Sequence, residues 1–114
     1  MINILIEKGF QLKSLAHITG GGLVDNVPRV FPDGLAAQIN INSWPKIPIF
    51  QFLIDNLELE IGELYRTFNM GIGLTIIVSP SQKNYLLKML GKGNCYEIGV
   101  MVANPSKQVY LNDR

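Results

Sequence analysis

The stretch Leu15-Ala16-His17-Ile18-Thr19-Gly20-Gly21-Gly22 joins a short apolar run to three consecutive glycines. The run predicts a buried strand over residues 15–18, because it is short and ends in a glycine cluster. Residues 23–27 then predict one or two helical turns that Pro28 ends. Three glycines at such a junction let the backbone turn sharply and let a ligand approach without side-chain interference.

This junction is also where the residues best suited to chemistry gather. The free N–H groups at the start of a helix favour an anion such as phosphate. Thr19 adds a hydroxyl, and His17 is suited either to donate to the same anion or to transfer a proton. The alternative is that residues 20–22 form a flexible surface turn and His17 is a satisfied core histidine, since the spacing is neither a Walker loop nor a dinucleotide fingerprint.

Three further polar residues are candidates, two of them for the same opening. Asn26 and Arg29 follow the glycines closely, and an Arg fork suits a phosphate or carboxylate, although a single Arg is often only a surface ion-pair partner. A second glycine-bearing junction, residues 66–73, carries Asn69, which either hydrogen-bonds a ligand or caps the end of a helix.

The rest of the chain alternates between strand and helix patterns. A Pro-Asp-Gly turn at residues 32–34 precedes a half-buried strand over 35–41, and Ser43 with Pro45 predicts the start of a helix whose apolar stripe covers residues 49–57. Further patterns predict a helix over 60–68, a strand over 74–78, a helix capped by Ser81, and two antiparallel strands over 96–103 and 108–111. We therefore expect an α+β sandwich in which one sheet is covered by helices.

Composition excludes several classes of protein. The 114 residues are 47% hydrophobic with a net charge of +1, which excludes a disordered chain and argues against a general polyanion or nucleic-acid binder. The longest apolar runs are too short for a membrane span, and residues 1–8 do not have the pattern of a signal peptide but that of a helix end. The single cysteine indicates a reducing compartment, and we expect a cytoplasmic location.

Other conspicuous residues favour structural roles. Cys95 is expected to be a structural thiol, Trp44 a packing anchor and Tyr65 a core residue. The three glutamates at 58, 60 and 63 have no histidine among them, so they predict a solvated helix face, and no metal site is expected.

Several of these segments together resemble a known family, phosphoribosylformylglycinamidine cyclo-ligase, also called aminoimidazole ribonucleotide synthetase. The resemblance rests on HITGGG at residues 17–22, Asn-Val-Pro-Arg at 26–29, Pro-Asp-Gly at 32–34, Ser-Trp-Pro at 43–45 and YRTFNMGIG at 65–73. It covers essentially the whole chain.

The resemblance implies an activity that composition does not. Enzymes of this family use ATP and Mg²⁺ to activate the formyl oxygen of formylglycinamidine ribonucleotide, and ring closure gives aminoimidazole ribonucleotide, ADP and phosphate in de novo purine synthesis. They are cytoplasmic homodimers in which an N-terminal domain and a C-terminal α/β/α domain enclose the active cleft. Carried over by motif, His17 would be the catalytic residue, while Thr19, Gly20, Gly21, Gly22, Asn26, Arg29 and Asn69 would bind substrate or phosphate.

Relative to that family, this sequence begins late. Residues 1–114 are expected to be a single C-terminal-domain fragment that lacks the N-terminal ATP-binding domain and the first strand and helix of its own domain. Such a fragment would be incomplete at its N-terminal side, inactive alone, without bound ATP or Mg²⁺, and marginal or self-associating unless a partner fills the gap. Two alternatives stay open: a non-catalytic module that binds a phosphorylated ligand, and a structural half that completes a separately encoded N-terminal chain.

Overall fold

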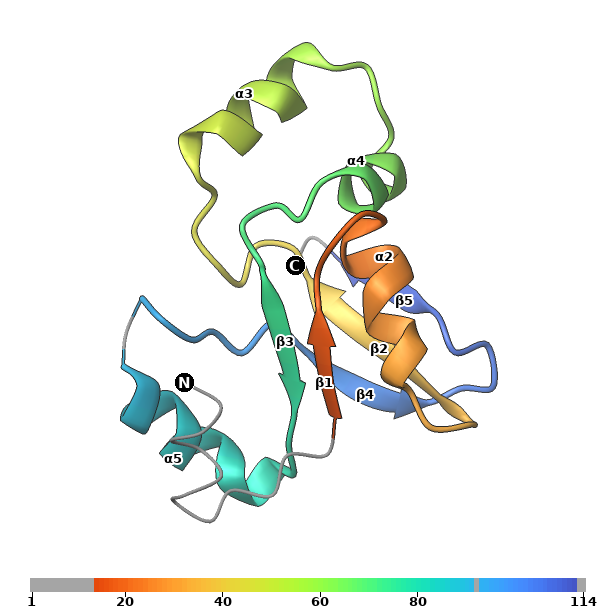
Figure 1. Ribbon diagram of the computed structural model, residues 1–114, viewed down its shortest axis with the longest axis vertical. Helices are drawn as coiled ribbons and strands as arrows, with labels where there is room; N and C mark the ends of the chain where they lie inside the picture. The colour runs from red at the N-terminus through yellow and green to blue at the C-terminus, as the bar shows by residue number, and fades with distance from the viewer. Residues whose placement is uncertain (1–13, 92, 113–114) are drawn as a thin grey trace.

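The computed structural model describes residues 14–91 and 93–112, so the helix end expected over residues 1–8 lies outside the described residues. The described chain is a mixture of helices and strands (Figure 1), which confirms the predicted α+β class. In chain order the elements are β1 Ser14–His17, α2 Gly22–Asn26, the 3-10 helix η1 Val27–Val30, β2 Leu35–Asn40, α3 Pro48–Asn56, α4 Ile61–Thr67, β3 Leu74–Ile77, α5 Pro80–Leu90, β4 Gly99–Ala103 and β5 Val109–Asn112.

The strands form two sheets instead of the single sheet that the sequence suggests. β1 pairs with β3 in an antiparallel ribbon, while β2 lies between β4, antiparallel to it, and β5, parallel to it. The last two strands therefore do not pair with each other as expected. β2 takes the central place because it buries residues on both of its faces, Ala36 on one and Ala37 and Ile39 on the other.

One main core joins both sheets to α2 and α4. Its buried residues are Ala16, Ile18, Leu23, Val27, Phe31, Ala37, Ile39, Ile41, Trp44, Leu64, Tyr65, Met70 and Ile72. Trp44 is the anchor that the sequence predicts: its indole Nε1–H donates to Met70 O at 3.0 Å, and its ring lies edge-on to Tyr65 with centroids 6.3 Å apart. Tyr65 is likewise in the core, as predicted.

Two helices do not begin where Ser43 and Ser81 predict. In both, a proline is the first helical residue, so α3 begins later and α5 earlier than expected. Ile47 has the extended backbone that a following proline favours, so α3 starts at Pro48, and Ser43 instead donates its Oγ–H to Asn40 O at 2.6 Å. α5 likewise begins at Pro80 and places Ser81 inside its first turn. Pro28 does not end the helical segment that precedes it, because the chain continues as η1 through Val30.

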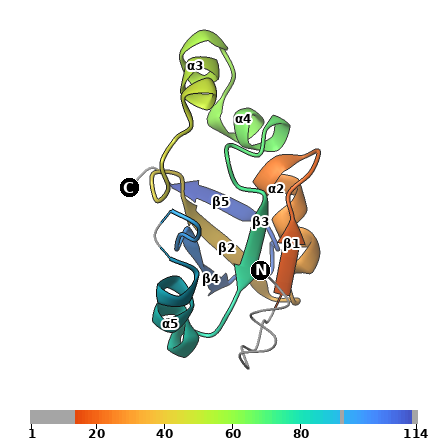
Figure 2. The ribbon, with the colours of Figure 1, turned by 60° about the vertical axis from the view of Figure 1, so that its left-hand side comes forward.

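α3 and α5 lie at opposite ends of the molecule (Figures 1 and 2). α5 covers a small second cluster in which Leu86 packs with Ile76, Val78, Met89 and Leu90. α3 stands away from both sheets, and none of its nine residues is fully buried, although Phe50 and Ile54 are partly buried against the main core. In the described part of the chain, no helix combines the length and apolar character that crossing a membrane requires.

Candidate functional site

The two glycine-bearing junctions lie side by side at one end of the β1–β3 ribbon. His17 pairs with Leu74 at the end of the ladder, and beyond it the Ile18 N–H donates to Gly73 O at 2.9 Å. Residues 17–22 and residues 69–73 therefore form one edge of the molecule, which we call the loop edge. The structure thus brings together two segments that the sequence analysis treats as separate candidates.

The three consecutive glycines, Gly20, Gly21 and Gly22, differ in how strictly the fold needs them. Gly21 and Gly22 adopt positive φ of 100° and 60°. A Cβ on Gly22 would lie 2.0 Å from Tyr65 O and 2.7 Å from Phe68 O, and one on Gly21 would lie 2.7 Å from Asp25 Cβ. A Cβ on Gly20 would meet nothing within 4 Å. The fold therefore requires glycine at positions 21 and 22 but not at position 20.

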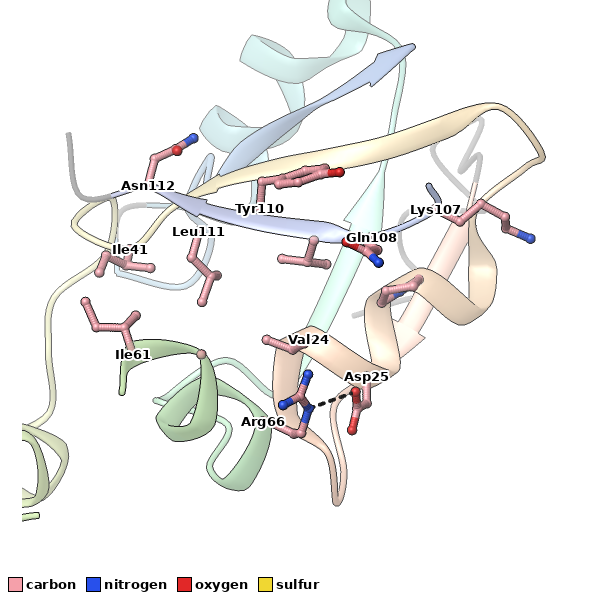
Figure 3. Close-up of a pocket in the computed structure, with 13 residues that line it drawn as sticks. Val24, Asp25, Ile41, Ile61, Arg66, Lys107, Gln108, Tyr110, Leu111 and Asn112 are labelled. Carbon is pink, nitrogen blue, oxygen red and sulfur yellow. Dashed lines mark hydrogen bonds and ion pairs between the residues drawn. The ribbon is translucent and has the colours of Figure 1, made fainter. Parts of the chain in front are cut away.

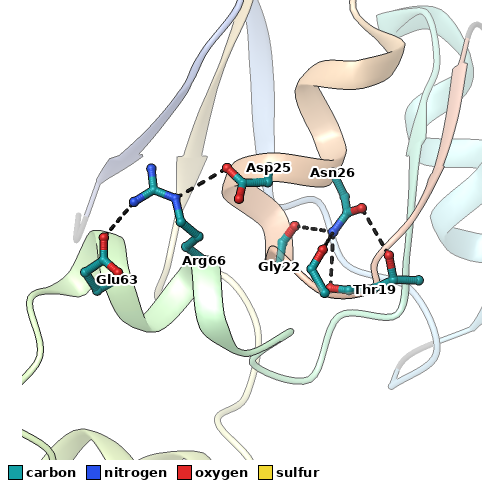
Figure 4. A network of polar contacts seen from close by, with 7 residues as sticks. Thr19, Gly22, Asp25, Asn26, Glu63 and Arg66 are labelled. Carbon is teal, nitrogen blue, oxygen red and sulfur yellow. Dashed lines mark hydrogen bonds and ion pairs between the residues drawn. The ribbon is translucent and has the colours of Figure 1, made fainter.

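Asn26 is buried beneath the glycine turn and holds its shape (Figure 4). Its Nδ2 donates to Gly22 O at 2.8 Å and to Thr19 O and Gly20 O at 3.2 Å each, while its Oδ1 accepts the Thr19 hydroxyl at 3.2 Å. These contacts engage both polar atoms of the amide with the loop itself. Asn26 is therefore a positioning residue of the turn in this structure.

Asn69 shapes the second loop. Its Oδ1 accepts the Gly71 N–H at 2.8 Å, and its carbonyl accepts the Ile72 N–H at 3.0 Å across a turn in which Met70 and Gly71 both have positive φ. α4 ends before it, with Phe68 at the C-cap position, so Asn69 organises the turn after the helix and does not cap the helix itself.

His17 is exposed, which rules out the alternative of a core histidine. Side chains alternate along β1, so His17 lies on the face opposite to Ala16 and Ile18. The latter two pack with Leu23 and Val27 of the helical segment in the main core. His17 and α2 therefore occupy opposite faces of the β1–β3 ribbon, and the imidazole is directed to the outer face, next to the exposed residues Thr19 and Gly20.

Arg29 is not at the loop edge. It is exposed in η1, and the neighbouring Val30 carbonyl accepts a hydrogen bond of 3.1 Å from Ser14 Oγ at the start of β1. The glycine turn follows the other end of the same strand. The helical segment thus runs back along β1 and carries Arg29 away from His17, so sequence proximity was misleading here.

An ion-pair network that the sequence analysis missed links α2 to α4 (Figure 4). Arg66 Nε lies 3.3 Å from Asp25 Oδ1, and its terminal nitrogen lies 2.6 Å from Glu63 Oε1. The hydrogen bond to Asp25, followed by the charges of both carboxylates, raises the pKa of the Arg66 guanidinium above its usual value. The i,i+3 spacing of Glu63 and Arg66 could have predicted their ion pair from the sequence. The ion pair with Asp25 could not be predicted in this way, because Asp25 is 41 residues away from Arg66.

Beside this network is a cavity of about 800 Å³ between α2, α4 and β5 (Figure 3). Asp25 and Arg66 stand on one side of it, and Gln108, Tyr110 and Asn112 contribute from β5 and the residue before it. None of the site residues predicted from sequence lines it. It lies on the α2 side of the molecule, whereas His17 faces the other side.

The remaining candidates have the structural roles expected of them. Cys95 is half-buried, and burial raises the pKa of its thiol, which makes the nucleophilic thiolate scarcer at neutral pH. Glu58, Glu60 and Glu63 are all exposed, as predicted, but only Glu63 lies within a helix, so they do not form the single helix face that was expected. Among the residues that the structure describes, no three His, Cys, Asp or Glu side chains gather where they could hold a metal ion.

Comparison with known proteins decides the family. The family described as "AIR synthase related protein, C-terminal domain" matches residues 1–112. The chain belongs to the AIR synthase C-terminal domain family. The resemblance drawn from the HITGGG and YRTFNMGIG segments is thereby confirmed, and this AIR synthase domain carries the first segment and the last five residues of the second on its loop edge.

Individual relatives agree with this assignment. Phosphoribosylformylglycinamidine cyclo-ligase of Bifidobacterium longum is 43% identical over 99 residues, which are 85% of this chain and 29% of that protein. The chloroplastic enzyme of Arabidopsis thaliana is 45% identical over 100 residues, 86% of this chain and 25% of its own length. The cyclo-ligase of Geobacillus kaustophilus is 46% identical over 87 residues, which are 76% of this chain and 25% of that protein. This AIR synthase domain thus spans about a quarter of the length of the curated relatives it matches.

Proposed function

We propose that this domain is part of a cyclo-ligase that converts formylglycinamidine ribonucleotide and ATP to aminoimidazole ribonucleotide, ADP and phosphate in de novo purine synthesis. The proposal is supported by the identity of 43–46% to enzymes named phosphoribosylformylglycinamidine cyclo-ligase. In it, residues 1–114 belong to the C-terminal domain, and the remainder of the longer enzyme contributes the ATP-binding domain. We place the enzyme in the cytoplasm, although the Arabidopsis relative is named chloroplastic.

One observation supports the assignment of residues: His17 is exposed on the loop edge, and Gly20 is exposed beside it with open space where a side chain would stand. His17 is free to donate a hydrogen bond to an anionic ribonucleotide, or to hold and move a proton at its imidazole nitrogen. Gly20 leaves the backbone open to close approach by a phosphate group. We therefore propose His17 as the catalytic residue and Gly20 as a substrate contact.

The other predicted site residues support these two. The Thr19 hydroxyl already donates its proton to Asn26, so in this arrangement it faces a ligand only as an acceptor. Gly21, Gly22, Asn26 and Asn69 fix the two loops in place. Arg29 is directed elsewhere, and we assign it no contact with the substrate.

The metal ion that the family reaction requires does not fit the described residues, which offer no cluster of ligating side chains. We derive no step through a metal or through ATP on this part of the chain. The nucleotide and Mg²⁺ are assigned by this proposal to the remainder of the longer enzyme, with the ribonucleotide lying between that part and the outer face of the β1–β3 ribbon.

The test is ADP release by the purified chain given formylglycinamidine ribonucleotide, ATP and Mg²⁺, alone and with the upstream portion of a cyclo-ligase relative. We expect turnover only in the mixture, and a loss of about 10²-fold or more with His17→Ala. Lys88→Ala, an exposed change on α5, is the matched control and leaves turnover unchanged.

Each other outcome refutes a defined part of the proposal. Full turnover by the His17→Ala mixture would make the domain a structural half. Tight binding of the ribonucleotide by the chain alone, with no turnover in any mixture, would make it a non-catalytic binding module. Turnover by the chain alone would show that the ATP machinery lies within these 114 residues.

A further inference from the structure

The Pro-Asp-Gly turn before β2 is a sequence motif that the candidate site does not use. The Leu35 N–H donates to Pro32 O at 3.4 Å and closes a β-turn around Asp33 and Gly34. Gly34 holds the third position with φ of 84°, as a type II turn requires. The turn lies at an outer corner of the molecule, beside the loop that joins β4 to β5 (Figure 1).

Asp33 and Gly34 are the only pair in the 114 residues in which an aspartate or asparagine precedes a glycine. Such a pair can react with itself, because the amide nitrogen of the second residue can attack the side-chain carbonyl carbon of the first. Glycine obstructs the attack least, since it has no Cβ. In a folded protein the reaction also requires an accessible carboxyl group and an amide N–H that no hydrogen bond holds.

This turn meets both requirements. The Asp33 side chain is 99% exposed. Among the contacts of the described residues, neither the Asp33 carbonyl nor the Gly34 N–H has a hydrogen-bond partner, although the Asn104 N–H holds the next carbonyl, Gly34 O, at 2.8 Å. A Cβ on Gly34 would meet no atom within 4 Å. The peptide unit between the two residues can therefore rotate between the type II and type I forms while the Leu35 N–H stays on Pro32 O.

One contact restrains the Asp33 carboxylate. The Lys107 Nζ lies 3.3 Å from its Oδ1, and the Lys107 side chain is itself 42% exposed. Exposed ion pairs of this kind are weak, so this one slows a reaction of the carboxyl group by at most about fivefold.

The other two aspartates that the structure describes provide an internal comparison. Asp25 precedes Asn26 in α2, and Asp55 precedes Asn56 in α3. The N–H of each asparagine belongs to a helix and bonds to the carbonyl four residues earlier. Attack by that nitrogen requires the helix to open first, which makes it rarer than attack in the turn.

We propose that Asp33 and Gly34 form a modification site at which the native domain converts, without an enzyme, to an isoaspartyl form. The Gly34 nitrogen bonds to Asp33 Cγ, the bond from Cγ to the carboxyl hydroxyl breaks, and the hydroxyl leaves with the amide proton as water. The product is a five-membered succinimide. Water then opens the ring. Breaking the bond from nitrogen to Cγ restores aspartate, and breaking the bond from nitrogen to the main-chain carbonyl carbon gives isoaspartate.

The isoaspartyl form differs from the original at a structurally important place. Its main chain passes through Cγ and is longer by one methylene, directly before β2, the central strand of its sheet. Its free carboxylate stands on Cα, the group that isoaspartyl methyltransferases modify, so the converted domain is a substrate for that class of repair enzyme. The inference does not depend on the catalytic assignment, because the turn follows η1 and lies away from the loop edge.

The test is to incubate the purified chain at neutral pH and physiological temperature and to follow isoaspartate by enzymatic methylation, with peptide mapping by mass spectrometry to locate it. The peptide that contains Asp33 should carry at least about tenfold more isoaspartate than those of Asp25 and Asp55. A synthetic peptide of residues 29–38 gives the rate without the fold. The native chain should react within about tenfold of that rate, because only the Lys107 ion pair and the turn restrain it.

Matched substitutions identify the reacting residue. Asp33→Glu keeps the charge opposite Lys107 but lengthens the side chain, so that attack would have to form a six-membered ring. This variant should lose the methylation signal of the turn. Asp55→Glu makes the same change at an exposed position of α3 and should leave the signal unchanged. Circular dichroism checks that both variants keep the fold.

Three results would overturn the inference. The first is a native chain that forms no isoaspartate while the synthetic peptide converts. The second is an Asp33→Glu variant that keeps the full signal. The third is as much isoaspartate at Asp25 or Asp55 as at Asp33, which would mean that the exposed turn confers no selectivity.

Discussion

Gly22→Ala is the substitution for which the structure predicts the clearest loss of stability. Gly22 begins α2 with φ of 60°, a backbone conformation that costs an L-residue other than glycine about 1–2 kcal/mol. The added Cβ would also lie 2.0 Å from Tyr65 O and 2.7 Å from Phe68 O. Since neither carbonyl can rotate away, α2 and α4 must separate, which costs about 1–3 kcal/mol as overpacking does elsewhere.

Together the two effects predict a loss of about 2–5 kcal/mol in the free energy of unfolding. A domain of this size is stabilised by only about 5–15 kcal/mol, so the loss is large enough to measure by urea denaturation followed by circular dichroism. Gly20→Ala is the matched control, because it adds the same methyl group two residues away, at a φ outside the left-handed range and with no atom within 4 Å. The control should change stability by less than about 1 kcal/mol, in the stabilising direction.

The comparison within one glycine triplet makes the reasoning refutable. If Gly22→Ala loses less than about 1 kcal/mol, the close approach of α2 to α4 is wrong. If Gly20→Ala loses as much as Gly22→Ala, the loop tolerates no side chain at any position, and the distinction between the glycines fails.

The other predictions follow from single contacts. Asn26→Ala removes the donor to three carbonyls of the glycine turn, of which the one on Gly22 is buried, and should cost about 1–3 kcal/mol in urea denaturation, where a change near zero would contradict its positioning role. Trp44→Phe removes the donor to Met70 O and should lower the thermal midpoint by several degrees, about 1–2 kcal/mol, whereas an unchanged midpoint would mean that the hydrogen bond adds nothing. Since burial raises the pKa of the Cys95 thiol, iodoacetamide at pH 8 should label the native chain more slowly than the urea-unfolded chain, and equal rates would refute the shielding. Burial also raises the pKa of Tyr65 above its unfolded value near 10. The stability that depends on the protonated phenol is therefore complete below about pH 10 and is lost as the pH rises further. Tyr65→Phe should lose less stability than the unsubstituted chain over that alkaline range, measured as urea midpoints at increasing pH.

The strands and helices that the sequence predicted correctly are those with strong short-range signals. β1, β2 and β3 follow from apolar runs or alternation, and α4 follows from its repeat of apolar residues. The starts of α3 and α5 were wrong because Pro48 and Pro80 outweighed the serine caps. The predicted pairing of the last two strands was wrong for another reason. β5 pairs with β2, which is some 70 residues away in sequence, and no local pattern encodes a pairing over that distance.

The candidate site was found in the sequence as a location, but its residues were not separated by role. HITGGG marks the loop edge, yet which glycine the fold needs depends on where Tyr65 and Phe68 present their carbonyls. Asn26 and Arg29 look equivalent in the sequence, three residues apart. The structure buries one beneath the glycine turn and carries the other to the far end of β1.

This separation of roles changes what the family motif indicates. Gly21, Gly22 and Asn26 are needed to build the loop, so any sequence that keeps the fold is under pressure to keep them whether or not it retains activity. His17 and Gly20 are exposed, and under the proposed function it is the substrate that gives the protein a reason to retain them. A domain of this family that has lost its substrate should therefore keep the glycine turn while losing His17 and Gly20. Substitution of a valine at Gly20 should reproduce that state, with the stability retained and the turnover of the complemented enzyme abolished.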